Sequence, residues 1–426
     1  MPQRRVKSLT VRGLWGYRNV SLRFFSDVNI LIGRNGSGKT TIMNLLWSAM
    51  SGDFVSLASA DYESLELKLT SWDEQDTTFA IVVAPDGLGG MNITVEGKKF
   101  EVPGPSDDWR AHPSRVYRYQ QMEQFEAARA ALGDATKAVW LPVSRRLPIP
   151  EEEEDALARR SRGASQRLES VDHTIRRLLR ELRDYRALIN VQLSQRFKEF
   201  EREVLTLMLY DKKEKAWAIK HDELGTDDQE KLLKAFSDVG ILNPRLQSRV
   251  QEHFEAAKKV MDALRKGRNL VDLDADIMMV FPLIRRTSLM IEQARKLEED
   301  RIKLLAAQAL FISTTNRFLK PKTISISDDG ILSVHDPRRK KDIEPSLLSS
   351  GEKQIMILLI QALLNEREPV IYLADEPELS LHVSWQDQLV NAIMKLGGQM
   401  QLIVATHSPD VIGEFQANVL NLDRQE

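Results

Sequence analysis

A glycine-rich loop near the start of the chain constrains the fold more than any other feature. The segment LIGRNGSGKTTIMNLL, residues 31–46, contains Gly33-x-x-x-x-Gly38-Lys39-Thr40 between a predicted strand and a predicted helix. Glycines at this spacing let backbone N–H groups surround phosphate oxygens, and the N-terminus of the following helix adds a favourable dipole. A lysine and a hydroxyl at the end of such a loop are typical ligands of phosphate and of Mg²⁺. The sequence therefore predicts a strand, a Walker A phosphate loop and a helix in direct succession.

Two carboxylates follow an apolar run in the last third of the chain, in the segment VIYLADEPE at 370–378. This pattern is typical of a buried strand that delivers Asp375 and Glu376 to its carboxyl end. Asp375 suits an outer-sphere contact to Mg²⁺, and Glu376 is placed to polarise an attacking water. A solvated turn before the proline is the alternative, and the Walker A loop in the same chain favours the catalytic interpretation.

Two further segments flank these carboxylates. In LSSGEKQ, residues 348–354, Ser349 and Gly351 begin a predicted helix whose hydroxyl and amides suit a phosphate. A plain N-cap serine with a glutamate three residues later has the same appearance, so this alternative stays open. In IVATHSPD, residues 403–410, His407 follows a predicted strand, where a lone histidine is usually structural. The fixed order of the four segments favours a nucleotide site.

Hydrophobic patterning divides the chain into three regions. Residues 1–150 contain short alternating runs that predict strands, among them SLELKLT, TFAIVVA and MNITV. Residues 321–426 mix predicted strands with helices, including the hairpin TISISDDGILSV and the strand QLIVAT. Because the first region holds the Walker A loop and the last holds the other motifs, we expect the two to form one α/β head.

The middle region, 151–320, has a helical pattern. Apolar residues recur at alternating steps of four and three over 171–189, and the same rhythm, with three polar positions, returns over 290–318. This is the heptad pattern of paired helices. Shorter helical segments lie between, near 211–282. We expect an antiparallel coiled-coil arm with a small helical tip, inserted between the two halves of the head.

Composition excludes several classes of site. The 426 residues include no cysteine, which excludes a disulfide framework, thiolate zinc sites and cysteine catalysis, and which fits a reducing compartment. The first residues lack the apolar core of a signal peptide, and no apolar run approaches the ~18–20 residues that span a bilayer. We expect a cytoplasmic protein with no membrane contact. A net charge of −2 neither favours nor excludes nucleic acid.

The motif set resembles the ABC-type ATPase heads of the chromosome-maintenance and Rad50-like group, in which a coiled-coil arm separates the two halves. LSSGEKQ together with DEPELSLHVSWQ and ATHSP is similar to the OLD-like bacterial ATPases of phage defence, which include subunits of the Septu and PARIS systems. There are departures. Rad50 carries a CxxC zinc hook that a cysteine-free chain lacks, and Ser350 stands where transporters usually carry glycine. OLD proteins carry a Toprim nuclease after the head, and we expect none in this chain.

The resemblance implies an ATPase that uses ATP and Mg²⁺. Metal contacts would come from Thr40 and Asp375, and catalysis from Glu376 together with His407, a switch histidine that contacts the γ-phosphate. The nucleotide contacts implied are Asn35, Gly36, Gly38, Lys39, Thr40 and Thr41. The signature residues implied to act on the nucleotide of another subunit are Ser349, Gly351 and Glu352.

Other positions stay open. The adenine contact is open among Arg12, Trp15 and Tyr17, and the Q-loop glutamine is not placed. His382 lies in the D-loop, which crosses the dimer interface in such families, and we expect it to serve packing or the interface rather than a metal.

Two functions follow from the resemblance and the charge pattern. The first is a sensor or scaffold subunit of a bacterial antiviral defence system. It would dimerise on ATP, assemble further, and control a separately encoded effector, a Toprim nuclease, until a phage protein triggers it. The second is a Rad50/RecF-like DNA-repair or DNA-clamping ATPase, which the arginines of 159–186 and the basic segment DPRRKK at 336–341 would serve. A solvated helix face and a basic hairpin loop are the alternatives for these segments. A transporter subunit is disfavoured because the arm has no counterpart there.

Overall fold

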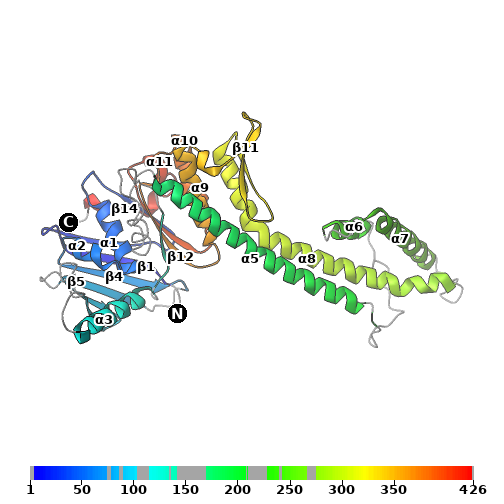
Figure 1. Ribbon diagram of the computed structural model, residues 1–426, viewed down its shortest axis with the longest axis horizontal. Coiled ribbons are helices and arrows are strands. Elements are labelled where there is room, and N and C mark those ends of the chain that lie inside the picture. The colour runs from blue at the N-terminus through cyan, green and yellow to red at the C-terminus, as the bar shows by residue number, and fades with distance from the viewer. Residues whose placement is uncertain are drawn as a thin grey trace. The chain divides into compact units, whose positions relative to one another are not determined.

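The computed structural model divides the chain into two compact units, with the division inside two long helices (Figure 1). Unit 1 comprises residues 1–184 and 308–426, and unit 2 comprises 185–307. The residues that the structure describes are 4–73, 78–85, 90–102, 115–133, 136–141, 169–207, 209, 228–238, 242–265 and 275–424. The acidic run EEEED at 151–155 lies outside this set, as do Pro142, Pro148 and Pro150.

Unit 1 contains a six-stranded antiparallel sheet in the order β2-β1-β4-β5-β6-β7. Its strands are β1 (Arg4–Leu14), β2 (Arg18–Arg23), β4 (Ser64–Ser71), β5 (Thr78–Pro85), β6 (Met91–Val95) and β7 (Lys98–Val102). In β4, Leu65, Leu67 and Leu69 are fully buried while the residues between them are half-exposed. This alternation is the pattern of a sheet with one face in the core.

A second sheet of five strands is parallel throughout and runs in the order β14-β3-β13-β12-β8. Its strands are β3 (Val28–Ile32), β8 (Ala138–Leu141), β12 (Val370–Asp375), β13 (Met400–Ala405) and β14 (Val419–Asn421). Strand β3 pairs on both sides with strands from the end of the chain. The two halves are therefore interleaved in one sheet, and the predicted α/β head split by an inserted antiparallel helical arm is confirmed.

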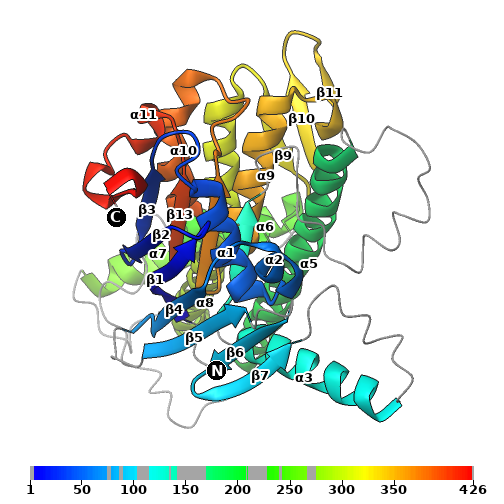
Figure 2. The same ribbon diagram turned by 90° about the vertical axis from the view of Figure 1, so that its left-hand side faces the viewer.

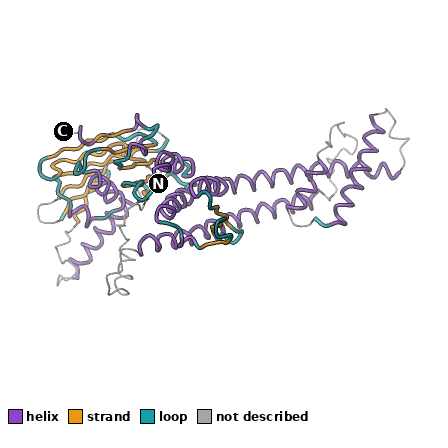
Figure 3. Tube along the Cα trace, turned by 90° about the horizontal axis from the view of Figure 1, so that it is seen from above, coloured by secondary structure: helices purple, strands orange, loops and turns teal. Residues whose placement is uncertain are grey.

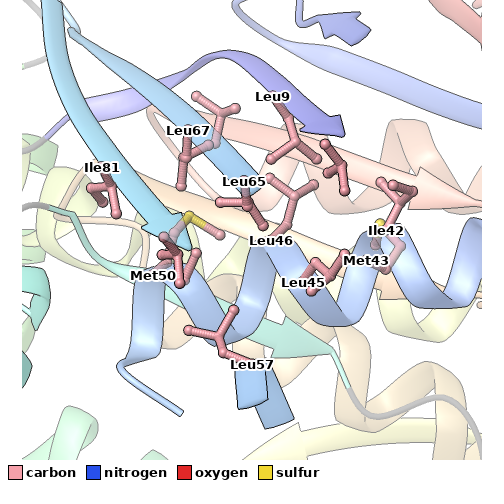
Figure 4. Packing of buried hydrophobic residues seen from close by; sticks show 14 of the residues in the cluster. Leu9, Ile42, Met43, Leu45, Leu46, Met50, Leu57, Leu65, Leu67 and Ile81 are labelled. Carbon is pink, nitrogen blue, oxygen red and sulfur yellow. The ribbon is translucent and has the colours of Figure 1, made fainter. Parts of the chain in front are cut away.

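Helices cover both faces of the parallel sheet. On one face, α1 (Lys39–Ser51) packs against β8, β12 and β13 and also against the antiparallel sheet (Figures 2 and 4). Ile42, Leu46 and Met50 of α1 belong to the same buried cluster as Leu65 of β4 and Ile371 of β12. On the other face, the Tyr372 hydroxyl of β12 donates to the carbonyl oxygen of Gln361 in α9 (Ser350–Leu364), 3.0 Å away. Double coverage accounts for the nearly continuous apolar sequence of β12 and β13.

Smaller elements complete unit 1. A three-stranded sheet in the order β11-β10-β9 contains the predicted hairpin as β9 and β10. Its strands are β9 (Thr323–Ile326), β10 (Leu332–Asp336) and β11 (Lys341–Ile343). The basic residues 338–340 lie in the turn between β10 and β11. The remaining helices are α2 (Phe54–Ser59), α3 (Arg115–Gly133), α10 (Val383–Leu396), α11 (Pro409–Ile412), and the 3₁₀ turns η2 (Pro345–Leu347), η3 (Gln416–Asn418) and η4 (Leu422–Arg424). Helix α3 and strands β7 and β14 were not predicted.

All described secondary-structure elements of unit 2 are helices (Figure 3). The chain enters it in α5 (Glu169–Leu207), continues through α6 (Asp228–Asp238) and α7 (Pro244–Arg265), and leaves in α8 (Ala275–Leu319). An ion pair of 3.5 Å joins Arg196 of α5 to Asp300 of α8. Leu232, Val250 and Ile291 form a small core between α6, α7 and α8. Among the described residues, no helix is long and apolar enough to cross a membrane.

A buried glutamine links the two sheets of unit 1. The Gln401 side chain in β13 accepts from the Val6 backbone N–H of β1 at 2.8 Å and donates to the carbonyl oxygens of Val6 and Phe25 at 2.8 and 2.7 Å. We expect Gln401→Ala to lower the free energy of unfolding by about 2–4 kcal/mol, because buried backbone groups lose their partners. Urea denaturation measures this change. Gln399→Ala is the control, because Gln399 is exposed on the same segment, and equal losses in both variants would contradict this account.

Candidate nucleotide site

Three parallel strands bring distant motifs to one edge of the sheet. Leu31 of β3 is in register with Ala405 of β13, and Ala405 is in register with Asp375 of β12. Because parallel strands end at the same edge, the residues that follow each strand meet there. These are the Walker A loop after β3, Glu376 after β12 and His407 after β13.

The Walker A loop has a backbone that its glycines make accessible. Gly36 and Gly38 have φ angles of 82° and 88°, and Gly38 is the N-cap of α1. A side chain on Gly38 would also collide with the Trp15 ring, whose Cη2 atom would lie 2.8 Å from the added Cβ. Of the three candidates for the adenine contact, the structure thus places Trp15 against the loop, whereas Tyr17 is 78% exposed. Asn35 lies in the loop itself, and Thr40 and Thr41 lie in the first turn of α1.

Lys39 is buried at the start of α1 and folds over the loop. Its Nζ donates to the carbonyl oxygens of Gly33 and Arg34 at 2.9 and 3.3 Å. Burial lowers the pKa of Lys39, while the nearby carboxylates Glu376, Asp375 and Asp423 oppose this shift. A bound phosphate would act in the same direction as these carboxylates and favour the charged lysine.

Two residues that the sequence analysis missed hold the loop from outside. The Arg18 guanidinium donates to the Ser37 carbonyl oxygen at 2.7 Å and to the carbonyl oxygen of Leu422. The Asp423 carboxylate accepts the Arg34 backbone N–H at 3.0 Å. No local motif marks either residue, because each contact joins segments that lie far apart in the sequence. Together they attach the phosphate loop to β2 and to η4.

Asp375 is partly buried at the end of β12. Burial raises the pKa of Asp375, a hydrogen bond from the Thr40 hydroxyl opposes the shift, and the Glu376 charge raises the pKa further. The Oδ1 atom of Asp375 is buried and has no hydrogen-bond partner within the protein. No group of three or more His, Cys, Asp or Glu side chains that could hold a metal occurs among the described residues. Thr40 and Asp375 nevertheless offer the oxygen donors that Mg²⁺ takes when phosphates supply the remaining ligands.

Glu376 and His407 face each other across the edge of the sheet. The Nε2 atom of His407 lies 3.8 Å from Oε1 of Glu376. Glu376 has a φ angle of 53°, and its backbone N–H donates to the Ala405 carbonyl oxygen at 2.7 Å. A non-glycine residue in the left-handed region is uncommon, and such residues cluster at functional sites. The backbone here directs the Glu376 carboxylate toward the loop that carries His407.

The signature segment forms the start of α9, where the structure realises the capping geometry. The Ser349 side chain accepts the Glu352 backbone N–H at 3.4 Å, and the Glu352 carboxylate accepts the Ser349 backbone N–H at 2.9 Å. Lys322 adds an ion pair of 2.7 Å to Glu352. Ser349 and Glu352 therefore form the helix cap that was the alternative interpretation of this segment. The backbone amides at the start of α9 still point along the helix axis.

Gly351 has a second structural role. A Cβ on Gly351 would lie 2.5 Å from the carbonyl oxygen of Ser380, so only glycine fits beneath the loop that follows Glu376. His382 in this loop is the N-cap of α10 and accepts the Ser384 backbone N–H at 3.2 Å. The loop therefore packs directly on the signature helix of the same chain.

A family model described as an AAA ATPase domain matches residues 5–412. The chain belongs to this family. The match includes the Walker A loop, the signature segment, both carboxylates and His407. It therefore supports the general prediction from these motifs, that the chain is an ATPase domain that binds nucleotide. Roles of individual residues stay predictions. A search of curated protein sequences finds no match.

Solved structures similar to this AAA ATPase domain include three Smc heads. One, from Pyrococcus furiosus, is an Smc head domain with an extended coiled coil bound to the C-terminal domain of ScpA. It is 15% identical, with 99% of this chain and 93% of that chain covered and a TM-score of 0.42. An Smc head with a coiled coil and joint from Pyrococcus yayanosii is 14% identical, with coverages of 99% and 95% and a TM-score of 0.41. An SmcHead bound to the C-winged helix domain of ScpA is 12% identical, with coverages of 98% and 93% and a TM-score of 0.40.

The ion pair at the signature predicts a pH-dependent stability. Despite opposition from burial, hydrogen bonds from Lys322 and Ser349 lower the pKa of Glu352. A carboxylate with a lowered folded-state pKa contributes stability above its unfolded pKa, and the contribution is lost as pH falls through the folded value. We expect Glu352→Gln to cost about 1–2 kcal/mol at pH 7 and progressively less in acid.

Urea denaturation of both proteins from pH 7 to pH 3 measures this difference. Glu344→Gln is the matched control, because Glu344 is an exposed carboxylate at the start of η2, the turn that precedes the same helix. A difference between Glu352→Gln and the unmodified chain that stays constant with pH would contradict the assignment.

Proposed function

We propose that this AAA ATPase domain binds ATP with Mg²⁺ and hydrolyses it by the ABC-type mechanism. One observation carries the proposal. Strands from both ends of the chain alternate in one parallel sheet and deliver the Walker A loop, Asp375, Glu376 and His407 to the same edge. Stability alone does not require a buried lysine, paired carboxylates and a glutamate with a left-handed backbone at one place, so their combination supports a catalytic site.

Each side chain has a role that its surroundings support. Lys39 would bind the β- and γ-phosphates from its buried position on the loop, and the amides of Asn35, Gly36, Gly38 and Thr41 would surround the phosphate oxygens. Glu376 would accept a proton from the attacking water, and His407, 3.8 Å away, would contact the γ-phosphate.

The metal would be held by Thr40 and Asp375. Their oxygens fit Mg²⁺, and the buried Oδ1 of Asp375 has no protein partner that it would have to release. Mg²⁺ would neutralise charge that develops on the phosphates.

We propose that two copies of the chain enclose the nucleotide, with Ser349, Gly351 and Glu352 of one copy covering the Walker A loop of the other. Three large apolar side chains are exposed around the signature and the loop that packs on it. Leu347, Leu379 and Val383 are 65%, 44% and 63% exposed. Exposed apolar side chains at these three positions support a face that another protein surface covers.

For the biological role, we propose an ATP-gated sensor or scaffold in a bacterial antiviral defence system. The motif set and a head split by one modest arm resemble AriA, the ATPase subunit of the PARIS system. In this proposal, residues 1–150 and 321–426 form the head and 151–320 the arm. The assembly, of dimers or of higher order, would hold a separately encoded Toprim nuclease until a phage protein releases it.

A DNA-clamping function is the second candidate, and one observation favours it. Arg176, Arg180 and Arg183 are exposed on α5 at spacings of four and three, so they share one helix face. Arg177, by contrast, pairs with Glu181 at 2.7 Å. The arginines at 159–167 lie outside the described residues. A row of exposed arginines suits the phosphates of duplex DNA.

Substitution of Glu376 tests the hydrolytic mechanism. Glu376→Gln keeps the shape of the side chain and removes the proton acceptor, so we expect ATP turnover to fall by about a hundredfold or more while ATP binding persists. The trapped nucleotide would stabilise the dimer, which size-exclusion chromatography with light scattering detects. Lys39→Ala is the companion variant and should lose ATP binding itself. Unchanged turnover in Glu376→Gln would refute the assignment of this residue.

Purification from the native operon tests the biological role. We expect a separately encoded nuclease to co-elute with the unmodified chain and to dissociate or become active after phage infection. A triple variant with Arg176, Arg180 and Arg183 changed to Gln should retain this partner. If no nuclease co-elutes and the triple variant instead loses salt-dependent binding to duplex DNA, the DNA-clamping function is the correct one.

A further inference from the structure

A third carboxylate at the site has no role in the mechanism above. Glu378 follows Asp375 by three residues, and its side chain is only 9% exposed. Its Oε1 atom accepts the Thr406 hydroxyl at 2.5 Å and the His407 backbone N–H at 3.2 Å. Its Oε2 atom is buried without a hydrogen-bond partner in the protein. A half-partnered buried carboxylate lowers stability, and such groups are retained at functional sites.

The contacts of Glu378 belong to a closed ring of hydrogen bonds. The next bond after Thr406 is the one from the Ser408 backbone N–H, which donates to the Thr406 hydroxyl at 2.9 Å. The Ser408 hydroxyl donates to the Gln386 side chain at 2.7 Å, and Gln386 donates to the Leu381 carbonyl oxygen at 3.4 Å. The Leu381 backbone N–H returns to the Glu378 carbonyl oxygen at 2.9 Å. The ring joins the loop after β12 to the loop after β13.

The ring lies next to both the Walker A loop and the pair Glu376 and His407. The Thr406 backbone N–H donates to the Leu31 carbonyl oxygen of β3 at 3.1 Å, so the ring is anchored directly before the Walker A loop. Its other side holds the backbone of His407, whose imidazole lies 3.8 Å from Glu376. The Glu378 charge also contributes to the raised pKa of Asp375, which places it within the field of the same site.

We propose that Glu378 is a positioning residue that clamps the His407 loop and thereby sets the distance between His407 and Glu376. The inference rests on the proposed ATP hydrolysis and deepens it. Glu378 acts through the hydroxyl of Thr406 and the backbone N–H of His407 and does not touch the nucleotide. A misplacement of the order of 1 Å at reacting groups has large effects on rate, so a clamp of this kind controls turnover rather than nucleotide affinity.

The test uses the full chain and separates the clamp from hydrolysis. Three proteins are compared without nucleotide: the unmodified chain, Glu378→Ala and Thr406→Val. In each, hydrogen exchange is measured at the backbone amides of His407 and Ser408. We expect exchange to rise by about tenfold or more in both variants, because each loses an acceptor or donor of the ring. Glu414→Gln is the matched control, because Glu414 is an exposed carboxylate outside the ring, and its exchange at these amides should not change.

Steady-state kinetics provide the second measurement. We expect Glu378→Ala and Thr406→Val each to lower kcat by about tenfold or more with KM for ATP within about twofold of the unmodified value. The double variant should show no further loss, because both changes break one ring. Thr406→Ser keeps the hydroxyl and should retain both kcat and exchange protection. Thr406→Val preserves the side-chain volume, so it keeps the test informative if Glu378→Ala does not fold.

Unchanged exchange in Thr406→Val would overturn the clamp, as would increased exchange with unchanged kcat. Equal losses of kcat and of ATP affinity would overturn it as well, because they indicate general disruption of the site. Absence of ATP hydrolysis by the unmodified chain would instead refute the proposed function. The exchange measurement requires no turnover, so these two failures are distinguishable.

Discussion

The pairing of β3 with β13 on one side and β14 on the other is the interaction on which the rest of the head depends. A strand in the interior of a parallel sheet pairs its backbone groups with a neighbour on each side. Both neighbours of β3 come from the last part of the chain. Register is equally important. A slip of one residue between β3 and β13 would exchange the two faces of the slipped strand. The Walker A loop therefore has its position only because the two ends of the chain meet in register.

The insertion of helices between the two halves is compatible with this constraint because it does not interrupt the sheet. Long insertions add little to the entropy of closing a loop, and a folded insertion adds less than a flexible one. Hydrogen bonds that span the sequence hold the halves together, among them those of Gln401 with β1 and of Arg18 with Leu422. In unit 2, the helices satisfy their own backbone groups and need only a narrow apolar seam.

The predictable parts were those that local chemistry determines. Gly33 through Thr40 has few functions other than to bind phosphate, and the alternating runs of β4, β5 and β6 specify strands by their period. Two of the three polar seam positions in α8, Gln308 and Thr315, are buried as the heptad pattern requires, whereas Arg301 is exposed. Helix α3 was missed because its polar sequence has only a weak apolar stripe. The contacts of Arg18, Asp423 and Glu378 could not be predicted, because they depend on which distant segments the fold brings together.

The placement of β14 and η4 has a consequence for biosynthesis. The N-terminal half leaves the ribosome with β3 lacking both neighbours and with the phosphate loop lacking the Asp423 and Leu422 contacts that hold it. Domains generally fold as units during synthesis, so this half must wait while the whole helical insertion is translated. An exposed strand edge of this kind is prone to wrong pairing during the delay. We therefore expect the phosphate loop to reach its final arrangement only after residue 423 has emerged.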